Sequence, residues 1–175
     1  MFSRRHALKA CAAFALSACA TTPNVQTDSD PTADFSGFRN YMWAFSTPQQ
    51  GVSALTWQRT RDAIDRTLQQ RGFALQEPAQ FAVGFTLGSR TEIRVDNFGP
   101  FYAHYRPGRG GWGTFGGPQT RTTTRGTLTI DVFDVATQRP VWSGAASQRI
   151  GSNVDQATIN AAVESVLARF PPNSG

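Results

Sequence analysis

The sequence predicts an α+β fold, a two-layer sandwich in which two helices cover one face of a mostly antiparallel, four-stranded sheet. Two observations carry this prediction. Residues 81–96 alternate between apolar and polar side chains almost without a break, whereas two other segments repeat their apolar residues at helical spacing. A helix with one apolar stripe must bury that stripe, and a sheet with one apolar face offers the partner. The elements follow in the order β-α-β-β-β-α.

The first strand and the first helix follow from two apolar patterns. Residues 39–46 carry aromatic side chains on alternate positions, which are Tyr41, Trp43 and Phe45, and this period is typical of a strand. Residues 55–71 repeat apolar side chains at helical spacing. That stripe consists of Trp57, Ile64 and Leu68. Gly72 follows, and glycine is the usual left-handed residue just past a helix end.

The longest strand covers residues 81–96. Its first half places large apolar side chains on odd positions, which are Phe81, Val83, Phe85 and Leu87. Its second half keeps the alternation but is more polar. We therefore expect a half-buried antiparallel strand whose far half projects beyond the core.

Two more strands and a second helix complete the predicted sandwich. Residues 122–134 and 140–150 predict strands. A capping motif at Ser152–Asp155 then begins a helix, with Asp155 near the positive helix end. The apolar stripe of this helix is Ile159, Ala162, Val163, Val166, Leu167 and Phe170. The pair Pro171-Pro172 ends it.

Periodicity stops between residues 99 and 118, where glycines alternate with aromatic residues and arginines. Such a long irregular excursion is usually either functional or disordered. Its candidate partner-binding side chains are Phe101, Tyr102, Tyr105, Arg106, Arg109, Trp112 and Phe115. Aromatic and arginine side chains of this kind stack on sugars, grip a protein or enter lipid headgroups. A flexible loop without a specific partner is the alternative interpretation.

The N-terminal residues 1–18 form a secretory signal peptide, with Arg4, Arg5 and Lys9 preceding a short apolar stretch. The segment Leu16-Ser17-Ala18-Cys19 resembles a bacterial lipobox. That resemblance implies that the chain is cleaved before Cys19 and that Cys19, as the new first residue, is acylated. An ordinary signal peptide with a cysteine is the alternative. The arginine pair is compatible with general secretory or twin-arginine export. The residue after the cysteine is Ala20 and not aspartate. By analogy with lipoprotein sorting in bacteria with two membranes, this favours attachment to the outer membrane.

Removal of the signal changes the charge balance. The full chain has 17 basic and 12 acidic residues and a formal net charge of +5. Loss of Arg4, Arg5 and Lys9 leaves 14 basic residues against 12 acidic ones, so the net charge becomes +2. Scattered arginines at this low net charge do not make a basic footprint, and nucleic acid is excluded as a partner.

The remaining chain divides into a tether and one domain. Residues 19–33 are small, polar and interrupted by proline, and we predict a flexible, lipid-anchored tether. Residues 34–172 form a single α+β domain that contains the loop at 99–118.

Catalytic chemistry has little support in the sequence. His104 is the one histidine left after processing, and no recognisable nucleophile, phosphate-loop or zinc motif accompanies it. The sequence predicts no cofactor and no metal site. Two carboxylate pairs remain, Asp62 with Asp65 and Asp131 with Asp134. Solvated carboxylates paired with arginine are the favoured interpretation of both.

These segments together resemble the DUF4136 family of bacterial envelope lipoproteins over about residues 25–172. The motifs that carry the resemblance are Asp34-Phe35, Ala63-Ile64-Asp65, Gly72-Phe73, Gly126-Thr127-Leu128, Val141-Trp142-Ser143-Gly144-Ala145 and Phe170-Pro171-Pro172. The family's function is not known, so the resemblance implies a fold and an envelope location but no catalytic residues.

The resulting prediction is a non-enzymatic module that is anchored through Cys19 to the outer membrane and faces the periplasm. Its expected partner is another envelope protein or peptidoglycan. Two alternatives remain open. One is a hydrolase that acts on envelope polymers through carboxylates, and the other is a small-ligand protein with a pocket between sheet and helices.

Overall fold

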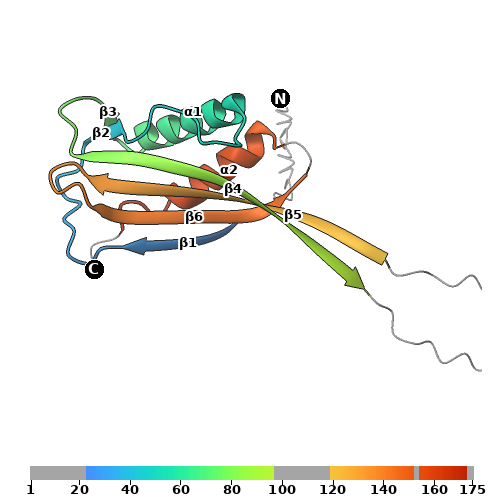
Figure 1. Cartoon of the computed structure of the whole chain (residues 1–175). Coiled ribbons are helices and arrows are strands. Elements are labelled where there is room, and N and C mark those ends of the chain that lie inside the picture. The colour runs from blue at the N-terminus through green and yellow to red at the C-terminus, as the bar shows by residue number, and fades with distance from the viewer. Residues whose placement is uncertain (1–22, 97–118, 152–153, 173–175) are drawn as a thin grey trace, which may run out of the picture.

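The computed structural model describes residues 23–96, 119–151 and 154–172. In these residues, six strands form one sheet, and two helices pack on the same face of it (Figure 1). The strands are β1 (Asn24–Ser29), β2 (Asn40–Trp43), β3 (Ala74–Leu75), β4 (Phe81–Asp96), β5 (Gln119–Asp134) and β6 (Pro140–Ile150). The helices are α1 (Ala54–Gln70) and α2 (Gln156–Leu167). The predicted two-layer mixture of one sheet and two helices is confirmed.

The sheet order is β1-β6-β5-β4-β2-β3. The first four of these strands are antiparallel neighbours, whereas β2 runs parallel to both β4 and β3. A parallel pair needs a crossover connection, and α1 provides it between β2 and β4. The predicted bounds of β4 and β6 are confirmed, and β5 begins at Gln119, three residues earlier than predicted.

The predicted strand count of four is wrong, because β1 and β3 also belong to the sheet. β1 lies inside the predicted tether 19–33, so that part of the tether prediction is wrong for residues 24–29. These residues pair with β6 from Asn24 opposite Ser147 to Ser29 opposite Trp142. A solvent-facing edge strand needs little apolar surface, and Val25 alone packs against the core. Its polar sequence therefore resembles a linker.

Local signals at the helix ends agree with the structure. After α1, Gly72 has φ +89° and its amide donates to the Gln69 carbonyl, which closes the helix in a left-handed turn. At the start of α2, Asp155 itself is the N-cap and accepts a hydrogen bond from the Thr158 amide at 2.7 Å. The predicted position of Asp155 near the positive helix end is confirmed, whereas Ser152, the first residue of the predicted capping motif, lies outside the described residues. No helix in the described residues is long and apolar enough to cross a membrane.

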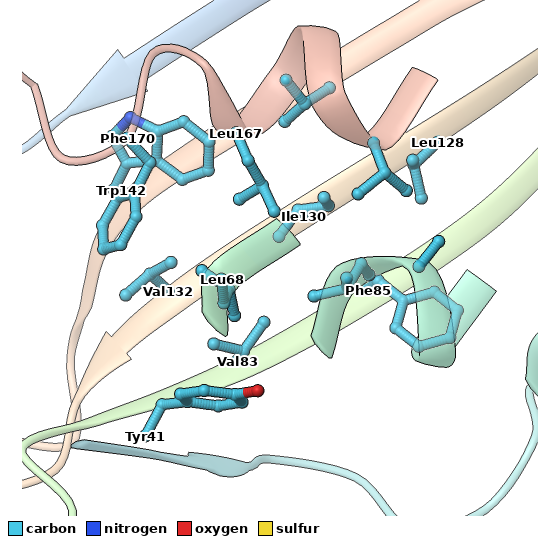
Figure 2. Packing of buried hydrophobic residues seen from close by; sticks show 14 of the residues in the cluster. Tyr41, Leu68, Val83, Phe85, Leu128, Ile130, Val132, Trp142, Leu167 and Phe170 are labelled. Carbon is cyan, nitrogen blue, oxygen red and sulfur yellow. The ribbon is translucent and has the colours of Figure 1, made fainter. Parts of the chain in front are cut away.

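The core lies between the helices and the inner face of β2, β4, β5 and β6 (Figure 2). Phe170, just past α2, is fully buried, and its ring packs against Trp142, Phe81 and Phe35. Gly144 lies opposite Ile130 in the sheet, and Trp142 and Val166 fill the space where a side chain would stand. This packing fixes the base from which β4 and β5 extend.

Candidate functional site

A two-stranded arm extends from the core (Figure 1). β4 and β5 pair without a register shift from Phe81 opposite Asp134 to Asp96 opposite Gln119. Their neighbours end earlier, since β2 stops pairing at Val83 and β6 stops at Ile150. We call residues 89–96 and 119–126 the arm; β6 still pairs with residues 124–126 at its base, so the arm is two-stranded from Glu92 and Thr123 onward. The predicted projection of the polar half of β4 beyond the core is confirmed.

The start of β1 lies level with the base of the arm. One row across the sheet runs from Asn24 through Ser147 and Thr127 to Gly88. The chain therefore enters the described domain at the same end of the sheet from which the arm leaves.

A cleft lies between the arm base and the N-terminal ends of both helices. Its volume is about 310 Å³, near the lower end of the roughly 300–1,000 Å³ common for ligand pockets. Its principal lining side chains come from α1, the inner sheet face and α2. They are Thr56, Thr60, Leu87, Leu128, Ala146, Gln148, Ile150, Thr158, Ile159 and Ala162. The cavity lies between the sheet and the helices, where the small-ligand alternative expects a pocket.

The cleft is uncharged, because none of the described residues that line it is acidic or basic. Thr60 is completely buried, and its hydroxyl donates to the Thr56 carbonyl at 2.9 Å. Gly126 leaves room for Ile150, whose side chain would lie 3.0 Å from an added Cβ. The cleft therefore suits an uncharged ligand with an apolar body and offers no group for acid–base chemistry.

An aromatic groove of about 260 Å³ lies beside β4, where α1 and the segment after β2 approach it. Its principal side chains are Trp43, Phe45, Trp57 and Phe85. The Arg61 guanidinium lies 4.8 Å from the Trp43 ring centre and 5.4 Å from that of Trp57. The indole nitrogen of Trp43 is buried without a hydrogen-bond partner in the described residues. The Arg61 contact already occupies a face of these rings, so the groove is the weaker ligand site.

Three arginines stand side by side at the arm base. Arg90 of β4 lies opposite Arg125 of β5, which lies opposite Arg149 of β6. They project from the sheet face opposite the helices, because the core pair Phe85 and Ile130 has the other parity. We call these residues the arginine row. Like charges directly opposite each other destabilise a sheet, and Glu92 offsets this only through an exposed 3.8 Å contact with Arg125.

The carboxylates of the hydrolase alternative have separate structural contacts. Asp131 accepts a hydrogen bond from the Ser143 hydroxyl at 2.7 Å. Asp134 accepts from the amide and the hydroxyl of Thr137 at 2.6 and 2.9 Å. Residues three apart on a strand project from opposite faces, so Asp131 and Asp134 do not converge.

The other carboxylate pair lies on α1, and its Asp65 supports the core. The buried Tyr41 hydroxyl donates to Asp65 at 2.6 Å. Burial, followed by the hydrogen bond and charge of Asp65, raises the pKa of Tyr41 well above its usual range. Tyr41 is therefore a protonated donor. In the described residues, no three acidic, histidine or cysteine side chains cluster as a metal would require.

The site residues predicted from sequence lie outside the described residues. They are Cys19 and the loop side chains Phe101, Tyr102, Tyr105, Arg106, Arg109, Trp112 and Phe115, together with His104. The cleft and the arginine row were missed. The alternation of Arg90, Glu92 and the following residues could have indicated a charged face, but the alignment with Arg125 and Arg149 depends on strand register.

Solved structures with a similar fold share little sequence with this chain. A PDZ domain protein from Parabacteroides distasonis matches with a TM-score of 0.55 and 11% identity, covering 85% of this chain and 35% of that chain. This chain thus spans about a third of that protein. A PelC dodecamer from Paraburkholderia phytofirmans, in a point variant and in another crystal form, gives TM-scores of 0.50 and 0.49 at 14% identity. Both matches cover 83% of this chain, and they cover 95% and 96% of the two PelC chains.

Fold and site together define a small α+β sandwich protein with an uncharged cleft and a projecting β-hairpin arm. No curated protein matches the chain significantly. A family model matches residues 25–172, and the chain belongs to that family, which is described as a domain of unknown function, DUF4136. The resemblance predicted from sequence is confirmed at the level of the family.

Proposed function

We propose that this protein is a non-enzymatic binding module of the bacterial cell envelope, anchored to the outer membrane through lipid on Cys19. In this proposal it faces the periplasm and binds or supports another envelope protein or peptidoglycan. The observation that carries the proposal is the row from Asn24 to Gly88, which sets the entry of the chain level with the arm base. An anchor at Cys19 then holds the arm end of the domain towards the bilayer.

The lengths of tether and arm sharpen this orientation. Five residue steps separate Cys19 from Asn24, and they reach at most about 17 Å. The eight steps from Gly88 to Asp96 extend about 26 Å along β4. Because the arm is longer than the tether, it cannot point straight at the bilayer without reaching it. It therefore lies along the membrane surface or contacts it.

The orientation is testable with a fluorophore on a single introduced cysteine in the full-length, anchored protein. Thr122→Cys places the probe on the arm, and Ala136→Cys places it in the turn at the opposite end of the sheet. We expect spin-labelled lipid headgroups in vesicles to quench the arm probe by about half and to leave the turn probe nearly unchanged, because such quenching needs near contact and the two probes lie at opposite ends of strands about 3.3 Å long per residue.

Two outcomes would contradict the proposal. Equal quenching at Thr122→Cys and Ala136→Cys would contradict the proposed orientation, in which the arm end of the domain faces the bilayer. Unchanged membrane fractionation of Cys19→Ser, together with no mass difference between the two purified proteins beyond that of the substitution itself, would contradict the lipid anchor.

A second candidate function rests on the cleft, which is a physical cavity at the place where a small-ligand protein would need one. We propose an uncharged, largely apolar ligand. Thr56→Phe fills the cleft from α1, whereas Gln58→Phe puts the same ring on an exposed position of that helix. Binding of the neutral dye Nile red should weaken about tenfold in Thr56→Phe only. Equal affinity in both variants would rule the cleft out as the dye site.

A further inference from the structure

The free edge of β4 is a second surface of the arm, distinct from the cleft. Near the core this edge is covered, because the Ala44 amide donates to the Val83 carbonyl and the Leu87 amide donates to the Gln49 side chain. No described strand or helix lies beside β4 beyond Leu87 on that side. The free edge therefore begins at Ser89.

The backbone groups at this edge follow from the covered part. A strand residue directs its N–H and C=O to the same side. Since Val83 and Leu87 direct theirs away from β5, the other odd-numbered residues do so as well. Ser89, Thr91 and Ile93 thus present a ladder of donors and acceptors that no other described residue pairs, and the side chains there are exposed, with Ile93 67% accessible.

Apart from the charged side chains of Arg90 and Glu92, the described residues hold none of the common devices that block an open edge. Edge strands are usually protected by charged side chains, especially lysine, by proline, by a bulge or by a covering segment. In the described residues, β4 contains no proline or lysine, and its register with β5 is continuous. A two-stranded ribbon on its own is only marginally stable in water. From Glu92 and Thr123 onward, where β6 has ended, the arm is such a ribbon and gains from a third strand.

The charges on the edge identify the partner strand. Arg90 and Glu92 are two residues apart on the same face of β4. When two β4 edges meet antiparallel with Thr91 opposite Thr91, Arg90 of each chain faces Glu92 of the other. Thr91 has its backbone groups directed to the edge, so it forms a hydrogen-bonded pair. The Arg90–Glu92 pairs are then the non-hydrogen-bonded type, in which side chains lie closest.

We propose that two copies of this chain pair through their β4 edges in this register and form one continuous sheet. The contact is isologous, as in most homodimers. A shift by one residue on each chain would place Arg90 opposite Arg90, which is unfavourable. The antiparallel direction puts the two cores at opposite ends of the shared ribbon, so no contact between cores is needed. The pairing does not depend on the lipid anchor proposed above.

Cysteine crosslinking of the full-length protein in its native membranes tests this pairing. Opposed Thr91 residues would have Cα atoms about 5.5 Å apart, which lies within disulfide range. Thr122 lies on the same arm face of β5, but its copy in the dimer would be three strand spacings away, about 14 Å. After mild oxidation we expect Thr91→Cys to give at least about fivefold more disulfide-linked dimer than Thr122→Cys.

The unsubstituted chain reports any bridge through its own cysteines, and the intact mass of the product identifies both partners. Equal crosslinking of Thr91→Cys and Thr122→Cys, or a product containing a different protein, overturns the proposal. A product from Ile93→Cys but not from Thr91→Cys overturns the register and the charge pairing with it.

Charge reversal supplies a second readout that folding defects cannot imitate. Arg90→Glu places a carboxylate opposite Glu92 twice in the dimer, and Glu92→Arg does the reverse. In the Thr91→Cys background, each single change should reduce dimer yield about tenfold, and the double change should restore it. Failure of the double variant to recover, with both single variants folded by circular dichroism, contradicts the pairing.

Discussion

The two halves of the β4–β5 hairpin share one register but have different surroundings. Near the core, Phe85 lies opposite Ile130 under the helices and both are buried. On the arm, Ile93 lies opposite Thr122, and both are exposed. The backbone pairing is continuous through both regions. Pairing therefore sets the length of the hairpin, whereas burial of one face decides which part is held rigidly.

The strongest way to sharpen this contrast is to truncate one large side chain in each region. Phe170→Ala removes a ring that packs on Trp142 and Phe81, and we expect a loss of about 3–5 kcal/mol in the free energy of unfolding. Ile93→Ala removes an exposed side chain and should change it by less than about 0.5 kcal/mol. Urea denaturation of the purified protein followed by tryptophan fluorescence measures both.

A loss above about 2 kcal/mol for Ile93→Ala in the monomeric protein would mean that the arm packs against part of the domain. The contrast between buried and projecting halves would then be wrong.

A matched pair of glycine substitutions tests the same contrast at the backbone. In Gly144→Ala the new methyl group meets Trp142 and lies 2.6 Å from the Val166 side chain, so we expect a loss of about 1–3 kcal/mol from overpacking. In Gly88→Ala nothing lies within 4 Å, and the loss of unfolded-state freedom should stabilise the protein by about 0.5 kcal/mol. Denaturation midpoints at unchanged m-value give both; equal destabilisation would contradict the packing described for Gly144.

Tyr41 tests the polar contact at the edge of the core. Tyr41→Phe removes the hydrogen bond to Asp65 and should cost about 1 kcal/mol at neutral pH. The pKa of Tyr41 is raised in the folded protein, so the unfolded chain ionises first. The stability from this group is present below about pH 10, the usual tyrosine pKa, and falls as the pH rises above it.

Unfolding measured at neutral and at alkaline pH separates the contribution of the Tyr41 hydrogen bond from that of its raised pKa. The unsubstituted protein should lose stability more steeply above pH 10 than Tyr41→Phe does. Parallel losses in the two proteins would show that another group dominates the alkaline transition.

The smallest expected effect concerns the caps of the two helices. Asp155→Ala removes the bond to the Thr158 amide and should lower the melting temperature by about 4 °C. Ser53→Ala is the matched control, because the side chain of Ser53 makes no capping bond. The Thr158 hydroxyl and amide lower the pKa of Asp155, so its contribution is lost as the pH falls through that lowered pKa. Equal melting shifts for both variants would contradict the cap assignment.

Most of the fold could be predicted because its long elements repeat one pattern over many residues. The bounds of β4 followed from its unbroken alternation, and the capping motif that ends at Asp155 placed this residue at the start of α2, although not as the N-cap itself. β1 was missed because a polar edge strand is held by backbone bonds to β6, which leave no side-chain pattern. β3 has only two residues, too few for any period.

The candidate sites could be predicted less well, because they combine residues that are distant in the sequence. Thr56, Gln148 and Thr158 meet at the cleft only after both helices dock on the sheet. The arginine row depends on the register of three strands. The pattern near residue 90 indicated one polar face but not which charges would be neighbours.

The arginine row has a consequence for the ionic environment of the arm. The three arginines occupy one row across neighbouring strands, and their mutual repulsion is screened over about 10 Å at 0.1 M salt. For most exposed charge contacts added salt weakens an attraction, but here it relieves a repulsion. The base of the arm should therefore become more rigid as salt is added, and a polyanion that docks along Arg90, Arg125 and Arg149 would release the bound counterions to solvent and gain entropy.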